Sequence, residues 1–120
     1  MAQKYIEGDV VMYGNNIMII KEPREEGHFD LLWNNWIIYS YINIEDIKPI
    51  PLTHEILEKN GWKKLYEKFF EKNVNDIRLT IEFSENIYVA INRIFIMEIH
   101  YIHELQHLLF GLGINHKMEV

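Results

Sequence analysis

Cysteine is absent from this 120-residue chain, which excludes disulfide scaffolds, thiol catalysis and zinc sites built on thiolates. Long apolar runs are also missing, because no stretch approaches the ~18 residues that a membrane-spanning helix needs. The first residues lack the charged segment and apolar run of a secretory signal. We therefore expect no membrane segment, and the lack of cysteine agrees with a reducing, cytoplasmic setting.

Positive charge is scarce as well. Lys and Arg together number 12 against 18 Asp and Glu, which gives a net charge of −6. Proteins that bind nucleic acids obtain much of their affinity by neutralising phosphates, so this balance argues against a nucleic-acid partner. The densest basic cluster, in residues 63–72, is interleaved with glutamates and indicates a solvated face.

What is present is typical of a globular α+β protein. Hydrophobic residues make up 48% of the chain, enough to form a core. We expect one domain over residues 1–120, with a β-rich part at 1–50 and a helix–strands–helix part at 51–120. The predicted order is an N-terminal curled, barrel-like antiparallel sheet, a short capped helix, further antiparallel strands and a C-terminal amphipathic helix.

Two hairpins are predicted in the first part. Gly14-Asn15-Asn16 and Asn34-Asn35 lie between apolar runs, and these residues tolerate the positive φ of tight turns. A two-residue turn at Asn34-Asn35 sets Trp33 opposite Trp36. The two indole rings then form either a cross-strand pair that stabilises the hairpin or an aromatic platform for a base or a peptide.

The second part begins with an extended connector at Pro49–Pro51. Thr53 is placed to cap a helix that Gly61 ends. Residues 63–72 fit either a helix or short strands, and the pattern leaves this open. Residues 77–83 alternate as a strand, residues 87–99 supply one or two more, and a final helix is expected from about Glu98 to Phe110.

This final helix contains His103-Glu104-Leu105-Gln106-His107, which matches the HExxH pattern of zinc peptidases. In that interpretation His103 and His107 bind zinc, His116 is the downstream histidine that can be the third ligand, and Glu104 is the general base. This alternative, a small zinc-dependent hydrolase, predicts one zinc per chain and metal–ligand distances of ~2.0–2.2 Å. It also predicts that Glu104→Gln abolishes activity while the fold stays intact.

Helical geometry favours a different interpretation. One apolar stripe runs along the helix, whereas His100, His103 and His107 share the opposite side, as in a surface helix docked on a sheet. Phe110 and Gly113 occupy the positions where the extended metzincin pattern has Gly and His. The exposed histidine face, with Phe110 beside it, is a candidate interface between copies in a homo-oligomer. Such a dimer would persist in chelator and dissociate on Phe110→Glu.

The chain resembles a widespread family of small proteins from gut anaerobes, their phages and their integrated elements. The shared motifs are "PIPLT" at Pro49–Thr53, then Gly61-Trp62, and a final helix that retains Tyr101, His103, Leu105, Gln106 and Leu108. Members usually have Gln where this chain has Glu104 and Asn where it has His107. The resemblance therefore implies that the HExxH here is a local variation of a structural signature, with no catalytic residue, metal or other cofactor.

The resemblance also implies a role. It predicts a non-catalytic accessory protein of a phage or mobile element, in the cytoplasm of the bacterial host. Such a host-interaction or anti-defence factor would bind a host protein or sequester a small nucleotide signal. A nucleotide ligand needs local positive charge, and the candidates are Arg24, Arg78 and Arg93.

Overall fold

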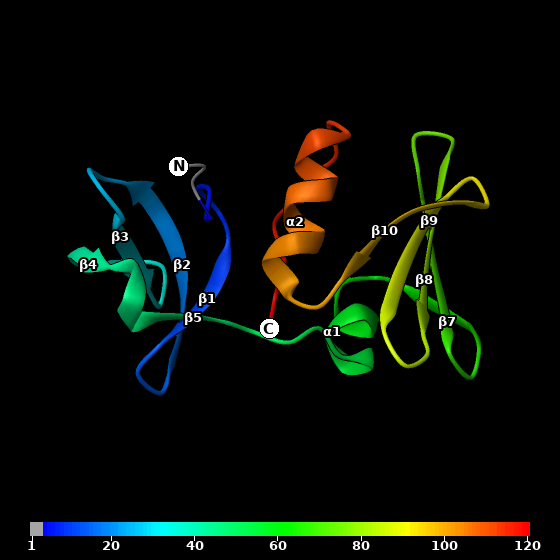
Figure 1. Ribbon diagram of the computed structural model, residues 1–120, viewed down its shortest axis with the longest axis horizontal. Helices are drawn as coiled ribbons and strands as arrows, with labels where there is room; N and C mark the ends of the chain where they lie inside the picture. Colours follow the sequence, from blue (N-terminus) through cyan, green and yellow to red (C-terminus); the bar gives the residue numbers. More distant parts are fainter. Residues whose placement is uncertain (1–3) are drawn as a thin grey trace. The chain divides into compact units, whose positions relative to one another are not determined.

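The computed structural model describes residues 4–120, which form two compact units (Figure 1). The first unit combines the residues up to Ile50 with Tyr101–Met118, and the second comprises Pro51–His100 together with Glu119. Each unit contains one five-stranded antiparallel sheet. The C-terminal helix thus belongs with the N-terminal sheet, whereas the sequence analysis grouped it with residues 51–100.

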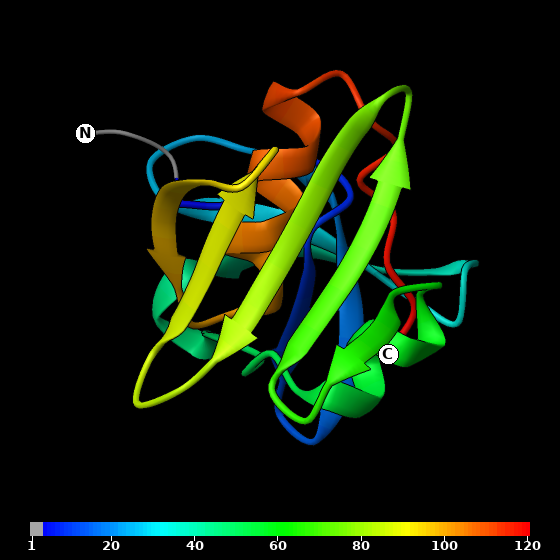
Figure 2. The same ribbon diagram turned by 90° about the vertical axis from the view of Figure 1, so that its right-hand side faces the viewer.

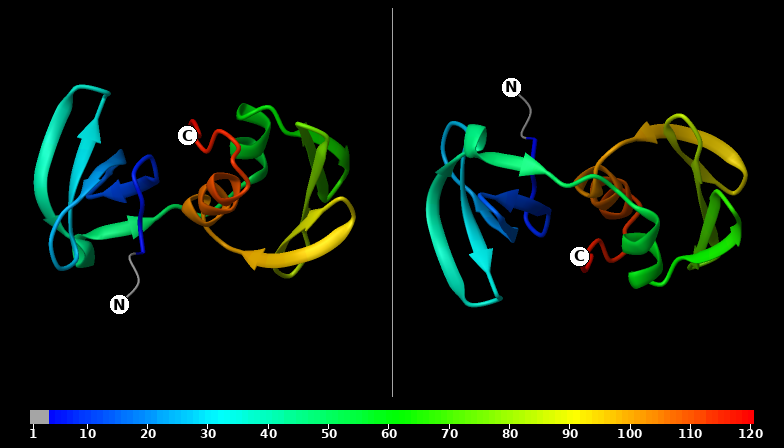
Figure 3. Two further views of the ribbon diagram at one scale, coloured as in Figure 1. Left: turned by 90° about the horizontal axis from the view of Figure 1, so that it is seen from above. Right: turned by 90° about the horizontal axis from the view of Figure 1, so that it is seen from below.

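The first sheet is a curled meander with the strand order β4-β3-β2-β1-β5 (Figure 3). The predicted barrel-like closure is wrong, because β4 and β5 are separate edges of an open sheet. The short β5 ends at a proline, which cannot donate to a ladder, and Tyr41 in β4 has a φ of 59°. The elements of this first sheet, with the 3-10 helix that precedes its last strand, are β1 (Val10–Tyr13), β2 (Asn16–Pro23), β3 (His28–Trp33), β4 (Ile37–Asn43), η1 (Ile44–Asp46) and β5 (Ile47–Pro49).

The two predicted hairpins have different outcomes. The first is confirmed, since Tyr13 pairs with Asn16 across a turn in which Gly14 has a φ of 61°. In the second, Trp33 pairs with Ile37, so the predicted pairing of Trp33 with Trp36 is wrong. Both asparagines of that turn have positive φ, and the loop takes in Trp36 as a third residue, 76% exposed.

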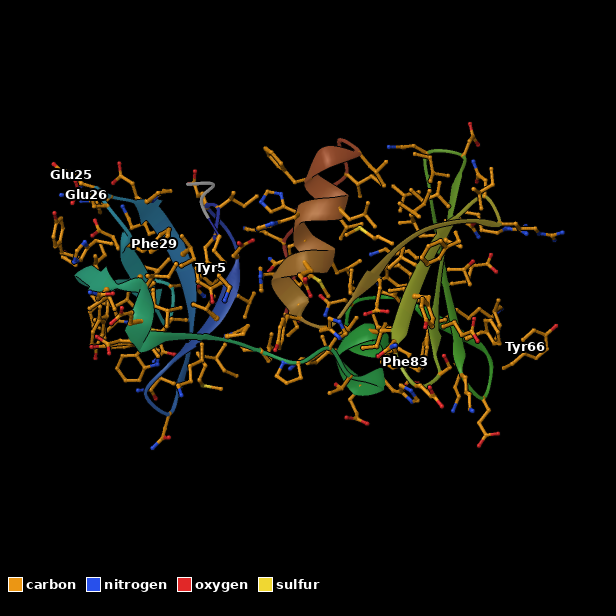
Figure 4. All side chains as sticks on the ribbon, in the orientation of Figure 1. Tyr5, Glu25, Glu26, Phe29, Tyr66 and Phe83 are labelled. Carbon is orange, nitrogen blue, oxygen red and sulfur yellow. The ribbon has the colours of Figure 1, made fainter. Side chains whose placement is uncertain are left out.

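The core of the first unit is a cluster of buried side chains on its sheet. The rings of Tyr5 and Phe29 meet edge to face, with their centroids 5.8 Å apart (Figure 4). The helix α2 (Ile102–Gly111) adds buried side chains to this unit. The buried cluster of the sheet consists of Tyr5, Val11, Met18, Ile20, Phe29, Leu31 and Ile47.

The second unit starts with the helix α1 (His54–Lys59), whose predicted ends are confirmed. Thr53 Oγ1 accepts a hydrogen bond from the N–H of Ile56 (3.3 Å), and Gly61 follows the helix with a φ of 86°. A sheet of order β10-β9-β8-β7-β6 follows (Figure 2). Its strands are β6 (Lys63–Tyr66), β7 (Phe69–Val74), β8 (Ile77–Phe83), β9 (Ile87–Ile91) and β10 (Ile94–Ile99).

This sheet answers the question that the sequence left open, since residues 63–72 contribute to the β6–β7 hairpin. The predicted strand over residues 77–83 is confirmed, and residues 87–99 form two strands. Because β10 continues to Ile99, α2 begins at Ile102 and not at Glu98. Among the described residues, no helix has the length and apolar character required to cross a membrane.

Candidate functional site

Gln106 lies at the centre of the histidine helix and is fully buried. Its Oε1 accepts a hydrogen bond from the N–H of Val10 (2.8 Å), at the start of β1. Its Nε2 donates to the carbonyl oxygens of Gly8 (2.8 Å) and His116 (2.9 Å). One side chain therefore joins α2 to both the first strand and the C-terminal segment, so the role of Gln106 here is structural.

His107 and Asp9 form a second link between α2 and the start of β1. His107 Nε2 lies 2.6 Å from Asp9 Oδ2, which also accepts a hydrogen bond from the N–H of Ile6 (2.8 Å). The carboxylate is fully buried, whereas the imidazole is about one-third exposed. Because a carboxylate can only accept, Nε2 of His107 carries the proton in this pair.

His103 is 4% exposed, so the prediction that it belongs to an exposed histidine face is wrong. Its ring packs edge to face on Tyr5, with centroids 5.0 Å apart, and stacks on Tyr101 at 5.9 Å. The segment that precedes β1 supplies Tyr5 and Asp9, and these residues cover a side of α2 that a helical wheel assigns to solvent. Helical periodicity alone could not reveal this second covering segment.

Burial has consequences for protonation at this cluster. Loss of water contact lowers the pKa of His103 below its ordinary value of 6.5, although the charge of Asp9 opposes the shift. Burial, reinforced by Asp9, raises the pKa of Tyr5 to about 12. Tyr5 Oη, Asp9 Oδ1 and His103 Nδ1 are buried polar atoms for which the described part of the chain offers no hydrogen-bond partner. At neutral pH His103 and Tyr5 are therefore uncharged.

Glu104 forms a hydrogen bond at the start of its own helix. Its Oε1 accepts a hydrogen bond from the N–H of Tyr101 (2.9 Å), the residue that caps the N-terminus of α2. A carboxylate at the third helical position is favourable because it satisfies a free amide and faces the positive end of the helix dipole. The glutamate of the HExxH pattern thus stabilises the start of its own helix.

These residues do not fit a zinc centre. His107 is bonded to Asp9, and His116 Nε2 donates to the carbonyl oxygen of Glu7 (3.1 Å). Between residues 4 and 120, no three His, Asp or Glu side chains are grouped so that they could hold a metal ion. The polar side chains of the HExxH motif instead pack in the first unit or cap the start of α2.

The remaining members of the predicted interface are dispersed. His100 precedes α2, belongs to the second unit and pairs with Glu98 at 2.9 Å. Phe110 is 59% exposed, and its ring lies 5.1 Å from that of His116. A continuous histidine face on α2 is therefore absent from the described residues, although Phe110 remains accessible.

Two of the three candidate arginines lie at one hollow of about 540 Å³ in the second unit. Arg78 follows the β7–β8 turn and Arg93 belongs to the β9–β10 turn, at the same end of the sheet (Figure 1). Arg24 belongs to the first unit, where it lies 3.8 Å from Asp30 and 3.6 Å from Glu22. The hollow is lined by Asn73, Asn75, Asp76, Arg78, Asn92 and Arg93.

The two candidate tryptophans, Trp33 and Trp36, have different surroundings. Trp36 projects from its turn, whereas Trp33 meets Tyr39 edge to face at 6.3 Å. Tyr39 in turn meets Tyr13 at 5.9 Å. Neither tyrosine was predicted from the sequence, and for Tyr39 the reason is the wrong register that placed Trp36 beside Trp33. Tyr13 lies on β1, so no register of this hairpin could indicate its contact with Tyr39.

No family model matches the chain, and no curated protein or solved structure is significantly similar to it. Functional conclusions therefore depend on the geometry of the residues described above.

Replacing Gln106 with Ala should lower the free energy of unfolding by about 3 kcal/mol, because three buried backbone groups lose their partner. Urea unfolding followed by circular dichroism measures this change. Phe110→Ala, on the same helix but at an exposed side chain, is the control and should cost under about 1 kcal/mol. A loss of stability for Gln106→Ala no larger than that of the control would contradict the role of Gln106 in joining α2 to β1 and to the C-terminal segment.

The buried, neutral His103 should make stability depend on pH. Below pH 6.5 the unfolded chain takes up a proton that the folded chain resists, so the stability present above this pH is lost as pH falls toward the lowered pKa. Asp9, His107, Glu104 and Lys4 are the charged or titratable groups that act on this ring.

We expect the loss of stability between pH 7.5 and pH 5.5 to be smaller in His103→Phe than in the wild type. Urea unfolding at both pH values measures it, and an NMR titration of the His103 ring gives the pKa directly. An equal loss in both proteins, or a His103 pKa above 6.5, would contradict the neutral form.

Proposed function

We propose that this chain is a non-catalytic binding protein of a phage or mobile element that acts in the cytoplasm of its bacterial host. Its ligand is a small anionic molecule of the nucleotide type, such as a host defence signal. The observation that carries this proposal is the meeting of Arg78 and Arg93, from two different hairpins, at one hollow. In a chain of net charge −6, this is a local concentration of fixed positive charge.

Two hydrogen bonds, one to the side chain of Asn92 and one between backbone groups, link Arg78 to the β9–β10 turn. The N–H of Arg78 donates to Asn92 Oδ1 (2.9 Å), and the N–H of Asn92 donates to the carbonyl oxygen of Arg78 (2.8 Å). Glu71 lies 3.5 Å from Arg78 Nε, which orients that guanidinium group. A ligand would therefore meet arginines whose backbone positions are already fixed, which lowers the entropy lost on binding.

The lining suits the parts of a nucleotide. A guanidinium group can form two parallel hydrogen bonds with one phosphate. The amide side chains of Asn73 and Asn75 can donate and accept toward a base, and the carboxylate of Asp76 can accept from a ribose hydroxyl. A volume of about 540 Å³ is within the usual range for small-molecule sites.

The contacts of helix α2 support the non-catalytic part of this proposal. Glu104 caps that helix and His107 pairs with Asp9, so a zinc hydrolase would require both side chains to leave these partners. Native mass spectrometry of protein purified without chelator tests this point. One zinc per chain, together with hydrolytic activity that Glu104→Gln abolishes, would favour the hydrolase and contradict the proposal.

Isothermal titration with AMP, cyclic AMP, GMP and inorganic phosphate tests the anionic ligand. We expect at least one nucleotide to bind, and Arg78→Gln/Arg93→Gln to weaken it at least tenfold, because each charge-assisted hydrogen bond contributes about 1.5–3 kcal/mol. Arg24→Gln is the control, since that arginine is equally exposed but lies in the other unit. Absence of binding by every probe, or unchanged affinity in the double variant, would contradict the nucleotide site.

A further inference from the structure

The first unit contains a different kind of hollow, with a volume of about 750 Å³. Two tyrosines, Tyr13 and Tyr39, line it together with the buried Met18. Two carboxylates, Glu45 and Asp46, are also in its lining. We call this site the aromatic groove; its lining is Tyr13, Gly14, Asn16, Met18, Tyr39, Glu45, Asp46 and Lys48.

Beyond the lining of the aromatic groove, Trp33 extends its two tyrosine rings into a row of three. Trp33 meets Tyr39 at 6.3 Å and Tyr39 meets Tyr13 at 5.9 Å, both edge to face. All three are partly buried and pack against the hydrophobic core of the first sheet. The core therefore fixes the positions of these rings, and none of the three residues is fully buried.

The two carboxylates of the aromatic groove are accessible to a ligand. Glu45 and Asp46 belong to η1 and are exposed, and the Asn43 side chain fixes the start of this short helix by accepting from the N–H of Glu45 (2.9 Å). Lys48 is the only cation of the lining. The aromatic groove thus combines aromatic rings with a net negative charge, the combination that attracts an ammonium or guanidinium group.

The spacing of the rings indicates the form of the ligand. In an extended peptide, side chains two residues apart are separated by about 6.6 Å. The ring-to-ring distances of 5.9 and 6.3 Å are close to this repeat, so alternate residues of one extended segment can contact successive rings. Three rings in a row exceed what a single small amine requires.

We propose that the aromatic groove binds an extended segment of a partner protein that carries lysine or arginine at alternate positions. The rings contact the aliphatic stems and cationic groups of those side chains, and Glu45 and Asp46 pair with their charges. This surface lies in the other unit from the arginine hollow. The two proposed sites therefore share no residues.

Fluorescence anisotropy with a labelled ten-residue peptide tests the inference. The probe alternates arginine with alanine, and a matched peptide has glutamate in place of every arginine. We expect the arginine peptide to bind, and the glutamate peptide and free arginine to bind at least tenfold more weakly. Equal binding of free arginine and the peptide would overturn the extended segment in favour of a site for a small cation.

The decisive variant is Glu45→Gln/Asp46→Asn, which removes two exposed charges and leaves the core unchanged. It should weaken the arginine peptide at least tenfold. Glu25→Gln/Glu26→Gln is the matched control, because it changes the charge equally at the β2–β3 turn of the same unit (Figure 4). Equal weakening by both double variants would indicate only general attraction to an acidic protein and would overturn the site.

A second readout concerns the rings. Tyr39→Leu keeps an apolar side chain over the core but removes the central ring of the row. It should weaken binding of the arginine peptide several-fold while the circular dichroism spectrum stays unchanged.

Arg78→Gln/Arg93→Gln should leave peptide binding unaltered, which separates failure of this inference from failure of the nucleotide site. A native mass spectrum that shows a dimer which the arginine peptide cannot dissociate, together with no peptide binding, would assign the aromatic groove to a second copy and overturn the proposal.

Discussion

The first unit depends on the hydrogen bonds of one buried amide. Gln106 bonds to Val10, Gly8 and His116, which are separated from it by up to 98 residues of sequence. A buried amide has a donor side and an acceptor side, and here both are satisfied by backbone groups that would otherwise be orphaned at the start of β1. An apolar residue could fill the same space but could not satisfy these groups.

The neighbouring Asp9–His107 pair also joins α2 to the start of the first sheet. It anchors the segment before β1 to α2, and that segment brings Tyr5 onto both Phe29 and His103. The polar groups of the helix thus order the N-terminal segment, which in turn completes the core of the sheet. Catalytic motifs and structural clamps use the same residue types, because both require polar groups held in fixed positions away from water.

The sequence predicted the structure well where a signal is local. The cap at Thr53, the stop at Gly61 and the alternation along β8 each depend on residues within one turn or strand. It failed where the outcome depends on distant residues. Nothing near His103 indicates that Tyr5 will cover it. The second hairpin failed for a local reason instead, because a third residue in the turn after Trp33 shifted the register of β4 against β3. Arg78 and Arg93 were named as separate candidates, but only the sheet shows that their turns share one end.

The backbone conformation of the β9–β10 turn lowers the stability of the fold. Asn92 and Arg93 form a two-residue turn in which both have positive φ, 50° and 70°. Asparagine tolerates this region, whereas for arginine the left-handed conformation costs roughly 1 kcal/mol relative to glycine. Glycine at position 93 would relieve the backbone but would remove the guanidinium group from the hollow. The turn therefore places an arginine at the hollow at a cost in backbone conformation.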